Sequence, residues 1–122
     1  EANSAMRAKV KQVILWCLEQ GHEVIVGDAR GVDGFVRVAC RVSKVLVTVY
    51  GAYGKIREPN IGATWETRVV TNGSYPERDA VMARACEMCI AIWNGRSKGT
   101  KITFEAAQGF GKRTIVRTFP IG

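Results

Sequence analysis

The spacing of apolar residues changes along the chain between that of helices and that of buried strands. Near the N-terminus, apolar residues recur with the 3.6-residue period of a helix, at Met6, Val10, Val13, Ile14, Cys17 and Leu18. We expect Ser4 to cap this helix and Gly21 to end it. Short, continuous apolar runs follow at residues 23–26, 45–50, 88–93 and 114–117. Such runs are typical of parallel strands that are covered on both faces.

The segments between these runs have helical patterns. One helix is predicted to start near Asp33, with Val32, Val36, Ala39 and Cys40 facing inward. A second is predicted at residues 77–85, with Pro76 at its start, and a third at residues 100–109. The third helix is expected to pack through Ile102, Phe104, Ala106 and Ala107. Residues 63–72 fit either a short helix or an irregular strand, and their assignment stays open.

Strands that alternate with helices predict an α/β fold. The implied architecture is Rossmann-like: a doubly wound, mostly parallel sheet with helices on both faces. The chain has 122 residues, of which 47% are hydrophobic, and this suits one compact domain over residues 1–122. No apolar run approaches the roughly 18 residues that span a bilayer, so no membrane partner is expected.

Charge and cysteine content narrow the possible ligands. Eighteen Lys and Arg against eleven Asp and Glu give a net charge of +7, which favours anionic partners. The basic residues are scattered, and this favours a small phosphorylated ligand over nucleic acid. Cys86 and Cys89 have the spacing of metal ligands, but His22 is the only histidine, so neither a metal nor a cofactor is expected. Reduced thiols and the absence of a signal-peptide pattern predict a cytoplasmic protein.

Two glycine-containing loops follow predicted strands and are the main candidates for a binding site. In open α/β sheets, ligands bind beyond the C-terminal ends of the strands. The loops are Gly27-Asp28-Ala29-Arg30-Gly31-Val32-Asp33 and Asn94-Gly95-Arg96-Ser97-Lys98-Gly99-Thr100. Each leads into a helix whose first N–H groups can hold a phosphate. The alternatives are that the first loop only turns the chain and that Ser97 and Thr100 only cap a helix.

Neither loop has the sequence of a common nucleotide-binding motif. The P-loop ending Gly-Lys-Ser/Thr and the pattern Gly-x-Gly-x-x-Gly are both missing from them, which disfavours ordinary ATPases and NAD-dependent dehydrogenases. Between the loops, Arg78 and Asp79 stand near a helix start and are candidates for binding a ribose or a phosphate. The alternative for this pair is a solvated helix face.

Taken together, the three segments resemble the SLOG superfamily, which includes Lonely Guy phosphoribohydrolases, molybdenum-cofactor carrier proteins and the Rossmann domain of DNA-processing protein A. Residues 27–33 resemble its Gly-x-Ala-x-Gly-Ala/Ile/Val-Asp element, residues 78–82 its Arg-Lys/Asn/Asp-x-x-Met element, and residues 97–100 its Gly-Thr loop. The similarity extends from Val24 to about Val116. It implies a ligand site formed by Gly27, Asp28, Ala29, Gly31, Asp33, Arg78, Asp79, Gly95, Ser97, Gly99 and Thr100.

The chain departs from this family in two ways. The phosphoribohydrolases carry a catalytic glutamate three positions after the loop threonine, and Thr103 stands there instead. Glu105 follows two residues later, which on a helix turns its side chain by about 200° and away from the site. Trp93-Asn94-Gly95 also replaces a Pro-Gly-Gly sequence. Family members further open with a central strand before their first helix, so here we expect that strand to lie outside the given residues or to come from a partner chain.

Three functions follow in order of preference. The first is a sensor or carrier that binds a nucleotide or nucleoside phosphate without turnover. The second is an N-glycosidic-bond hydrolase acting on nucleoside monophosphates, with Asp28, Asp79 or Glu105 as the catalytic carboxylate. The third is nucleic-acid binding. Self-association is also expected, through the amphipathic helix or through Trp16 or Trp65, although both aromatics equally suit a core.

Overall fold

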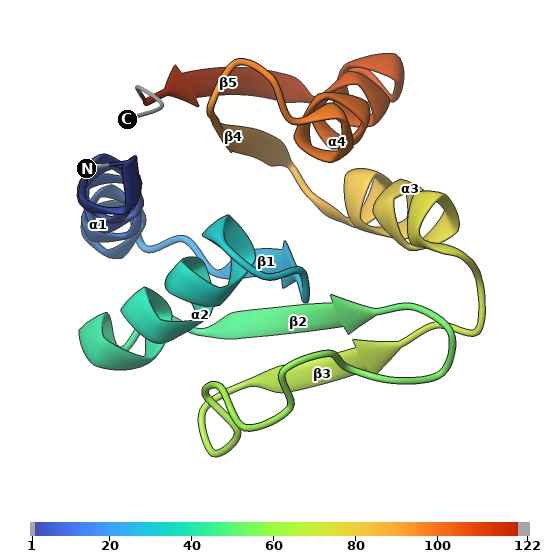
Figure 1. The fold of residues 1–122 in the computed structure, drawn as a ribbon, viewed down its shortest axis with the longest axis horizontal. Coiled ribbons are helices and arrows are strands. Elements are labelled where there is room, and N and C mark those ends of the chain that lie inside the picture. The colour runs from blue at the N-terminus through green and yellow to red at the C-terminus, as the bar shows by residue number, and fades with distance from the viewer. Residues whose placement is uncertain (1, 120–122) are drawn as a thin grey trace.

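The computed structural model describes residues 2–119 and shows a mixed α/β fold (Figure 1). Four helices and five strands form within these residues. In chain order they are α1 (Ala2–Gln20), β1 (Val24–Gly27), α2 (Val32–Ser43), β2 (Val47–Gly51), β3 (Thr67–Val70), α3 (Tyr75–Ala85), β4 (Met88–Trp93), α4 (Lys98–Gly109) and β5 (Arg113–Thr118). The four predicted helices and four predicted strands are all present, and β3 forms in the segment whose assignment was open.

The strands pair in parallel but form two sheets. β2 lies between β1 and β3 in the first sheet, and β4 pairs with β5 in the second. The register sets Val26 beside Val49 in the first sheet and Ile90 beside Ile115 in the second. The sequence predicted one sheet. In the described part of the chain, the free edges of β1 and β4 are not hydrogen-bonded to each other.

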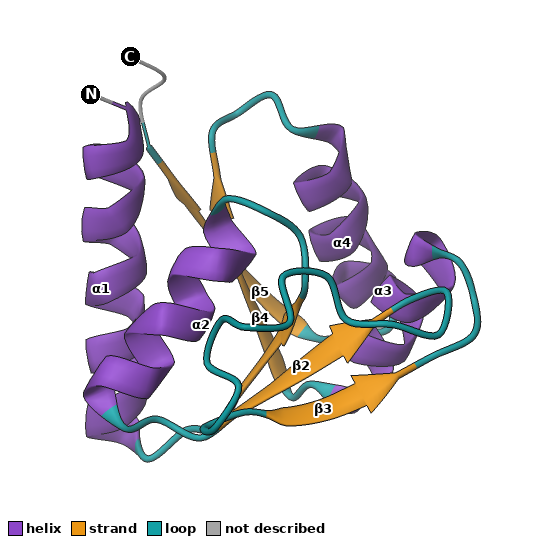
Figure 2. Cartoon of the chain, turned by 60° about the horizontal axis from the view of Figure 1, so that its bottom comes forward, coloured by secondary structure: helices purple, strands orange, loops and turns teal. Residues whose placement is uncertain are grey.

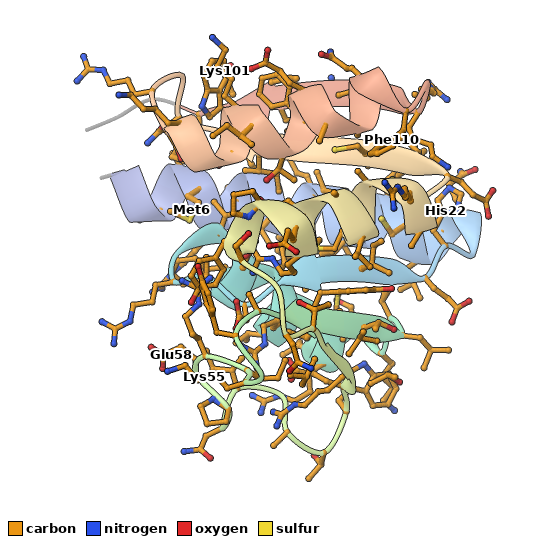
Figure 3. All side chains as sticks on the ribbon, turned by 90° about the vertical axis from the view of Figure 1, so that its right-hand side faces the viewer. Met6, His22, Lys55, Glu58, Lys101 and Phe110 are labelled. Atoms are coloured by element: carbon orange, nitrogen blue, oxygen red, sulfur yellow. The ribbon has the colours of Figure 1, made fainter. Side chains whose placement is uncertain are left out.

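The helices cover the strands from two sides. Figure 2 shows α1 and α2 on one side of the strands and α3 and α4 on the other. Figure 3 shows Met6, Glu58 and Lys101 at one end of the molecule and His22 and Phe110 at the opposite end. The strands run from the second end to the first. The start of α1 and the loops that follow β1 and β4 therefore share one edge, which we call the C-terminal edge.

Buried residues from both helices and strands form the core. Val10, Ile14, Cys40, Val47 and Val49 are each at most 3% exposed. The predicted inward faces of α1 and α2 are largely confirmed, because Val10, Ile14, Cys17, Val36 and Cys40 are buried. Trp65 packs against this core and donates its indole N–H to the carbonyl of Val45 at 2.7 Å.

Three predicted positions are wrong. Ser4 does not cap α1, because the helix already begins at Ala2 and Ser4 lies exposed inside its first turn. Leu18 is largely exposed because Cys17 takes the inward position of the last turn and the next residue lies 100° further round. Ile102 is also exposed, since it lies about 200° from Phe104, which faces inward.

Helix starts follow the capping groups more closely than the apolar pattern. α4 starts at Lys98, two residues earlier than predicted, because Ser97 is its N-cap. α3 starts at Tyr75 with a capping box in which the Ser74 hydroxyl accepts from the Glu77 amide and the Glu77 carboxylate accepts from the Ser74 amide. Within residues 2–119, no helix combines the length and the apolar character needed to cross a bilayer.

Candidate functional site

A cavity of about 540 Å³, called the slot from here on, lies between β1 and β4. Its walls include residues of β1 and β4 and apolar side chains of α1, α2, α3 and α4. The slot is open to solvent over part of its extent.

The first turns of two helices line the end of the slot at the C-terminal edge. Val32 and Asp33 come from α2, Thr100 and Thr103 from α4, and Gly27 from the end of β1. The two candidate loops thus meet at one mouth, as expected for loops that follow parallel strands.

The start of α2 leaves backbone donors free. Gly31 is its N-cap, with φ 84°, and provides no side-chain acceptor. The positive φ favours glycine at this position. Among the described residues, the amides of Val32, Asp33 and Gly34 have no acceptor.

The start of α4 is partly capped and surrounded by cations. The Asn94 side chain accepts from the amides of Arg96 and Ser97, both at 2.8 Å, and fixes the loop. The Ser97 hydroxyl accepts from the Thr100 amide and so caps the helix. The amides of Lys98 and Gly99 have no acceptor among the described residues. The side chains of Arg96, Lys98 and Lys101 are exposed around them.

Arg78 joins two buried aspartates. Its Nη1 donates to Asp28 at 2.8 Å, and its Nε and Nη2 donate to Asp79 at 3.0 and 2.8 Å. Arg78 is 6% exposed, Asp79 8% and Asp28 fully buried. Nε, Nη1 and Nη2 of the guanidinium are thus all engaged by carboxylates, and Nη1 also lies 3.5 Å from the Tyr50 carbonyl.

Asp28 has a second cationic partner that the sequence did not indicate. The Arg57 amide donates to one carboxylate oxygen at 2.6 Å, and the Arg57 guanidinium donates to the other at 2.9 and 3.1 Å. Burial raises the pKa of Asp28. The hydrogen bonds from Arg57 and the charges of Arg57 and Arg78 outweigh it, so the pKa lies below the ordinary value of 3.8.

Arg37 holds Arg57 in place. Arg37 is fully buried and pairs with Glu66 at 2.6 Å. It also donates to the backbone carbonyls of Arg57, Glu58 and Ile61 at 2.9 to 3.1 Å. The loop that follows β2 is thus fastened to α2. The sequence gave no signal for this contact, because neither Arg37 nor Arg57 belongs to a recognisable motif.

Asp33 is the carboxylate nearest the mouth of the slot. Its Oδ2 accepts from the Ala29 amide at 3.0 Å, and its Oδ1 has no partner among the described residues. Burial raises the pKa of Asp33, and the neighbouring charges of Asp79 and Asp28 add to this. The Ala29 hydrogen bond and the Arg78 charge oppose the shift without cancelling it.

Gly27 permits the close packing around this carboxylate. A Cβ atom on Gly27 would lie 2.8 Å from Asp33 Oδ2 and 2.9 Å from Arg78 Nη1. Any side chain here would therefore push the two charged groups apart.

Thr103, and not Glu105, reaches the cluster from α4. The Thr103 hydroxyl lies 3.2 Å from Asp79 Oδ2 and 3.0 Å from the Gly99 carbonyl, and it donates to one of them at a time. Glu105 is exposed. The three predicted catalytic carboxylates are therefore not brought together: Arg78 bridges Asp28 and Asp79, and Glu105 stays in solvent.

Most of the predicted ligand residues gather at the C-terminal edge. Gly27, Asp33 and Thr100 line the slot mouth, and Ala29 and Asp79 are hydrogen-bonded to residues that line it. Arg78 connects Asp79 to Asp28 behind them. Gly31, Ser97 and Gly99 belong to the two helix starts, and Gly95 shapes the loop before α4 with φ 84°. In the described part of the chain, no three His, Cys, Asp or Glu side chains are arranged to hold a metal ion.

Comparisons with known proteins gave no match to a family model, to a curated protein or to a solved structure. The function is therefore argued from the residues of this chain.

Proposed function

We propose that the protein binds a phosphate-bearing nucleotide or nucleoside-derived molecule at the C-terminal edge, as a sensor or carrier without turnover. We further propose that its two parallel sheets are halves of one doubly wound, Rossmann-like sheet of the SLOG kind. Support for this comes from the three SLOG-like segments, which follow each other in the family's order and lie together at one edge.

The observation that carries the proposal is the pair of helix starts at one mouth. The free amides of Val32, Asp33 and Gly34 belong to α2, and those of Lys98 and Gly99 to α4. Each helix start also has a partial positive charge from the helix dipole. Free donors and a positive dipole together bind phosphate groups.

The distribution of charge supports a phosphate position on the α4 side. Arg57 and Arg78 offset the charges of Asp28 and Asp79 within the buried cluster. Beyond the cluster, the exposed cations Arg96, Lys98 and Lys101 surround the first turn of α4. Asp33 stands on the α2 side with a free oxygen, which suits a sugar hydroxyl or a base N–H.

The carboxylates favour binding over hydrolysis. The oxygens of Asp28 and Asp79 already accept hydrogen bonds from Arg57, Arg78 and Thr103. Glu105 is outside the site. A carboxylate that acts on a glycosidic bond has to reach the reacting atoms, and geometry comes before pKa in that requirement.

Calorimetric titration with nucleoside monophosphates, diphosphates, nucleotide sugars and cyclic nucleotides tests this function. A G99D variant places a carboxylate where we locate the phosphate, and nothing lies within 4 Å of the added Cβ. We expect it to stay folded and to weaken binding by about tenfold or more, because like charges repel at close range.

The control is G109D, at the opposite end of α4, where an added Cβ also meets nothing within 4 Å. It adds the same charge and should leave the dissociation constant unchanged. If no member of the panel binds, the proposal is wrong. If a bound monophosphate releases its free base, the protein turns over its ligand and the carrier function is wrong.

A further inference from the structure

We propose that Tyr53 is the platform on which the nucleobase of the ligand stacks, and that Tyr75 and Arg57 connect this platform to the site. The inference rests on the proposed function, because it places the base of a ligand whose phosphate lies at the start of α4. Its evidence is a strained turn, an exposed aromatic ring and the position of both beside the charged cluster.

The turn that follows β2 has an unusual residue at its tightest point. Tyr53 and Gly54 both have positive φ, of 54° and 74°. The Lys55 amide donates to the Ala52 carbonyl at 3.2 Å, and these two residues form an antiparallel bridge. Two central residues with positive φ are characteristic of a type I′ turn, which favours Asn, Asp or Gly at the first of them. A tyrosine there is strained, because its Cβ crowds the backbone.

Burial of the side chain does not offset this strain. Tyr53 is 59% exposed. Its ring meets Tyr75 edge to face, with the ring centroids 5.2 Å apart and the planes at 82°. Aromatic side chains stabilise a fold mainly through the area that they bury, so an exposed ring contributes little. Strained residues of this kind cluster at ligand-binding sites, where the surrounding structure holds them.

The backbone of the turn is held in place by its neighbours. The Tyr53 amide donates to the Gly73 carbonyl at 3.0 Å, and the Gly54 amide donates to the Thr71 carbonyl at 2.9 Å. Both acceptors belong to the segment between β3 and α3. The ring therefore projects from a fixed backbone, and a ligand that stacks on it loses little free energy by ordering it.

Tyr75 connects the platform to the charged cluster. The Arg57 guanidinium lies 4.0 Å from the centroid of the Tyr75 ring, and the Arg78 guanidinium lies 5.2 Å from it. Both arginines also pair with Asp28. Arg57 uses Nε and Nη2 for Asp28, and its Nη1 has no acceptor in the described part of the chain. Nη1 is therefore available to a ring nitrogen or a carbonyl oxygen of a base.

The platform lies within reach of the start of α4. Lys55, which closes the turn, is at the C-terminal edge (Figure 3). The Thr103 hydroxyl lies 3.2 Å from Asp79, so α3 and α4 are in contact there. Tyr75 and Gly99 each precede these residues by four positions, which is about one helical turn. Helices in contact are about 8–10 Å apart, so the two helix starts are separated by roughly the distance between the base and the phosphate of one nucleotide.

The test replaces Tyr53 and measures stability and binding together. Y53N puts a residue that suits the turn in place of the strained one, so the melting temperature should stay the same or rise by a few degrees. The variant lacks the ring, so it should bind AMP and GMP about tenfold more weakly in calorimetric titrations, as loss of base stacking does. A lower melting temperature together with unchanged affinity would overturn the proposal, because Tyr53 would then serve the fold alone.

Matched ligands and variants show which group the ring contacts. Ribose 5-phosphate has no base, so Y53N should leave its dissociation constant unchanged, whereas G99D should weaken its binding and that of the nucleotides. Y53F keeps the ring and should bind AMP and GMP as the unsubstituted protein does. F110A removes an exposed ring at the opposite end of the molecule (Figure 3) and should not alter binding. An equal loss for ribose 5-phosphate and the nucleotides in Y53N would contradict base stacking.

Adenosine and guanosine have no phosphate and separate this inference from the proposed function. At millimolar concentration they should shift the NMR signals of the Tyr53 and Tyr75 rings. If they do, but no phosphate-bearing compound binds more tightly than its nucleoside, the proposed function fails and the platform holds. If ribose 5-phosphate binds at the start of α4, but no nucleoside or nucleotide shifts the Tyr53 signals, the platform is overturned and the proposed function holds.

Discussion

Arg78 keeps two buried carboxylates paired, and this makes it the most sensitive single residue of the site. It contacts Asp28 and Asp79 through charge-assisted hydrogen bonds of 2.8 to 3.0 Å. Removing one member of a buried ion pair leaves the remaining charge without compensation in a low dielectric. The cost of such a change exceeds what the pair itself contributes.

Replacing Arg78 with methionine is therefore expected to lower the free energy of unfolding by about 3–5 kcal/mol. The control is R84M on the same helix, whose exposed guanidinium stacks on Phe110 and whose loss should cost about 1 kcal/mol or less. Urea denaturation of both variants measures the two values. Equal losses would mean that Arg78 does not hold the aspartates.

Asp33 gives the site a pH dependence of its own. Its pKa in the folded protein is raised, mainly by burial, so ionising it costs folding free energy. That cost is present at neutral pH and is relieved as the pH falls through the raised pKa. Asp28 affects stability in the opposite direction. Because its pKa is lowered, ionised Asp28 stabilises the fold at pH values above the ordinary carboxyl pKa, and this stabilisation is lost as the pH falls below that value.

The D33N variant should therefore be more stable than the unsubstituted protein at pH 7, since asparagine keeps an acceptor for the Ala29 amide without the charge. The difference should shrink as the pH is lowered toward about 4, where carboxyls protonate in unfolded chains. Denaturant midpoints at several pH values between these limits measure it. A difference that is constant with pH would contradict the raised pKa.

Sequence motifs indicated several residues that the structure brings together, but not the partners of those residues. Asp28, Asp33, Arg78 and Asp79 stand in motifs of fixed spacing. Arg57 reaches Asp28 from a loop that carries no motif, and Arg37, 20 residues earlier in the sequence, donates to its backbone carbonyl. Such a contact is set by tertiary packing, which local patterns do not encode.

Capping groups define where the helices that support the site begin. Ser74 and Glu77 form a capping box at the start of α3, one turn before Arg78. Ser97 caps α4 next to the free amides of Lys98 and Gly99. These polar residues fix the two helix starts more closely than the apolar pattern, which placed α4 two residues late.

The S74A variant should lose about 1 kcal/mol of stability, since a capping serine contributes about 0.5–2 kcal/mol. S4A is the matched control, because Ser4 is exposed inside α1 and does not cap it. Its effect should stay within about 0.5 kcal/mol. Thermal unfolding of both proteins checks the contrast, and a larger loss in S4A would show that the cap was assigned to the wrong serine.

β3 shows the limit of pattern-based assignment at the scale of one element. The first and last residues of β3 are exposed and the two between them are half-buried. This pattern matches neither a continuous buried run nor a strict alternation of buried and exposed residues. The strand lies at an edge of its sheet and forms by pairing with β2. Pairing of that kind depends on a partner distant in sequence, so residues 63–72 by themselves gave no decision.

For the whole molecule, the order of the strands and helices could be predicted from the periodicity of the apolar residues. The division of the strands into two sheets could not. Apolar runs predict that β1 and β4 are buried strands of a parallel sheet. Both pair in parallel, but only Val26 and Gly27 of β1 and Ala91 and Ile92 of β4 are buried. Whether two strands lie side by side depends on the space between them, and here that space is the slot. The same slot brings the helix starts of α2 and α4 to one mouth, and so produces the candidate site.

A residue-resolved NMR titration of the folded protein with the tightest ligand of the nucleotide panel tests the central claim most directly. The account predicts that amide shifts concentrate at Val32 to Gly34 and at Lys98 and Gly99. His22 and Phe110, at the opposite end of the molecule (Figure 3), should not move. Shifts confined to that opposite end, or no shifts with any phosphate-bearing ligand, would contradict the claim that the protein binds such a molecule at its C-terminal edge.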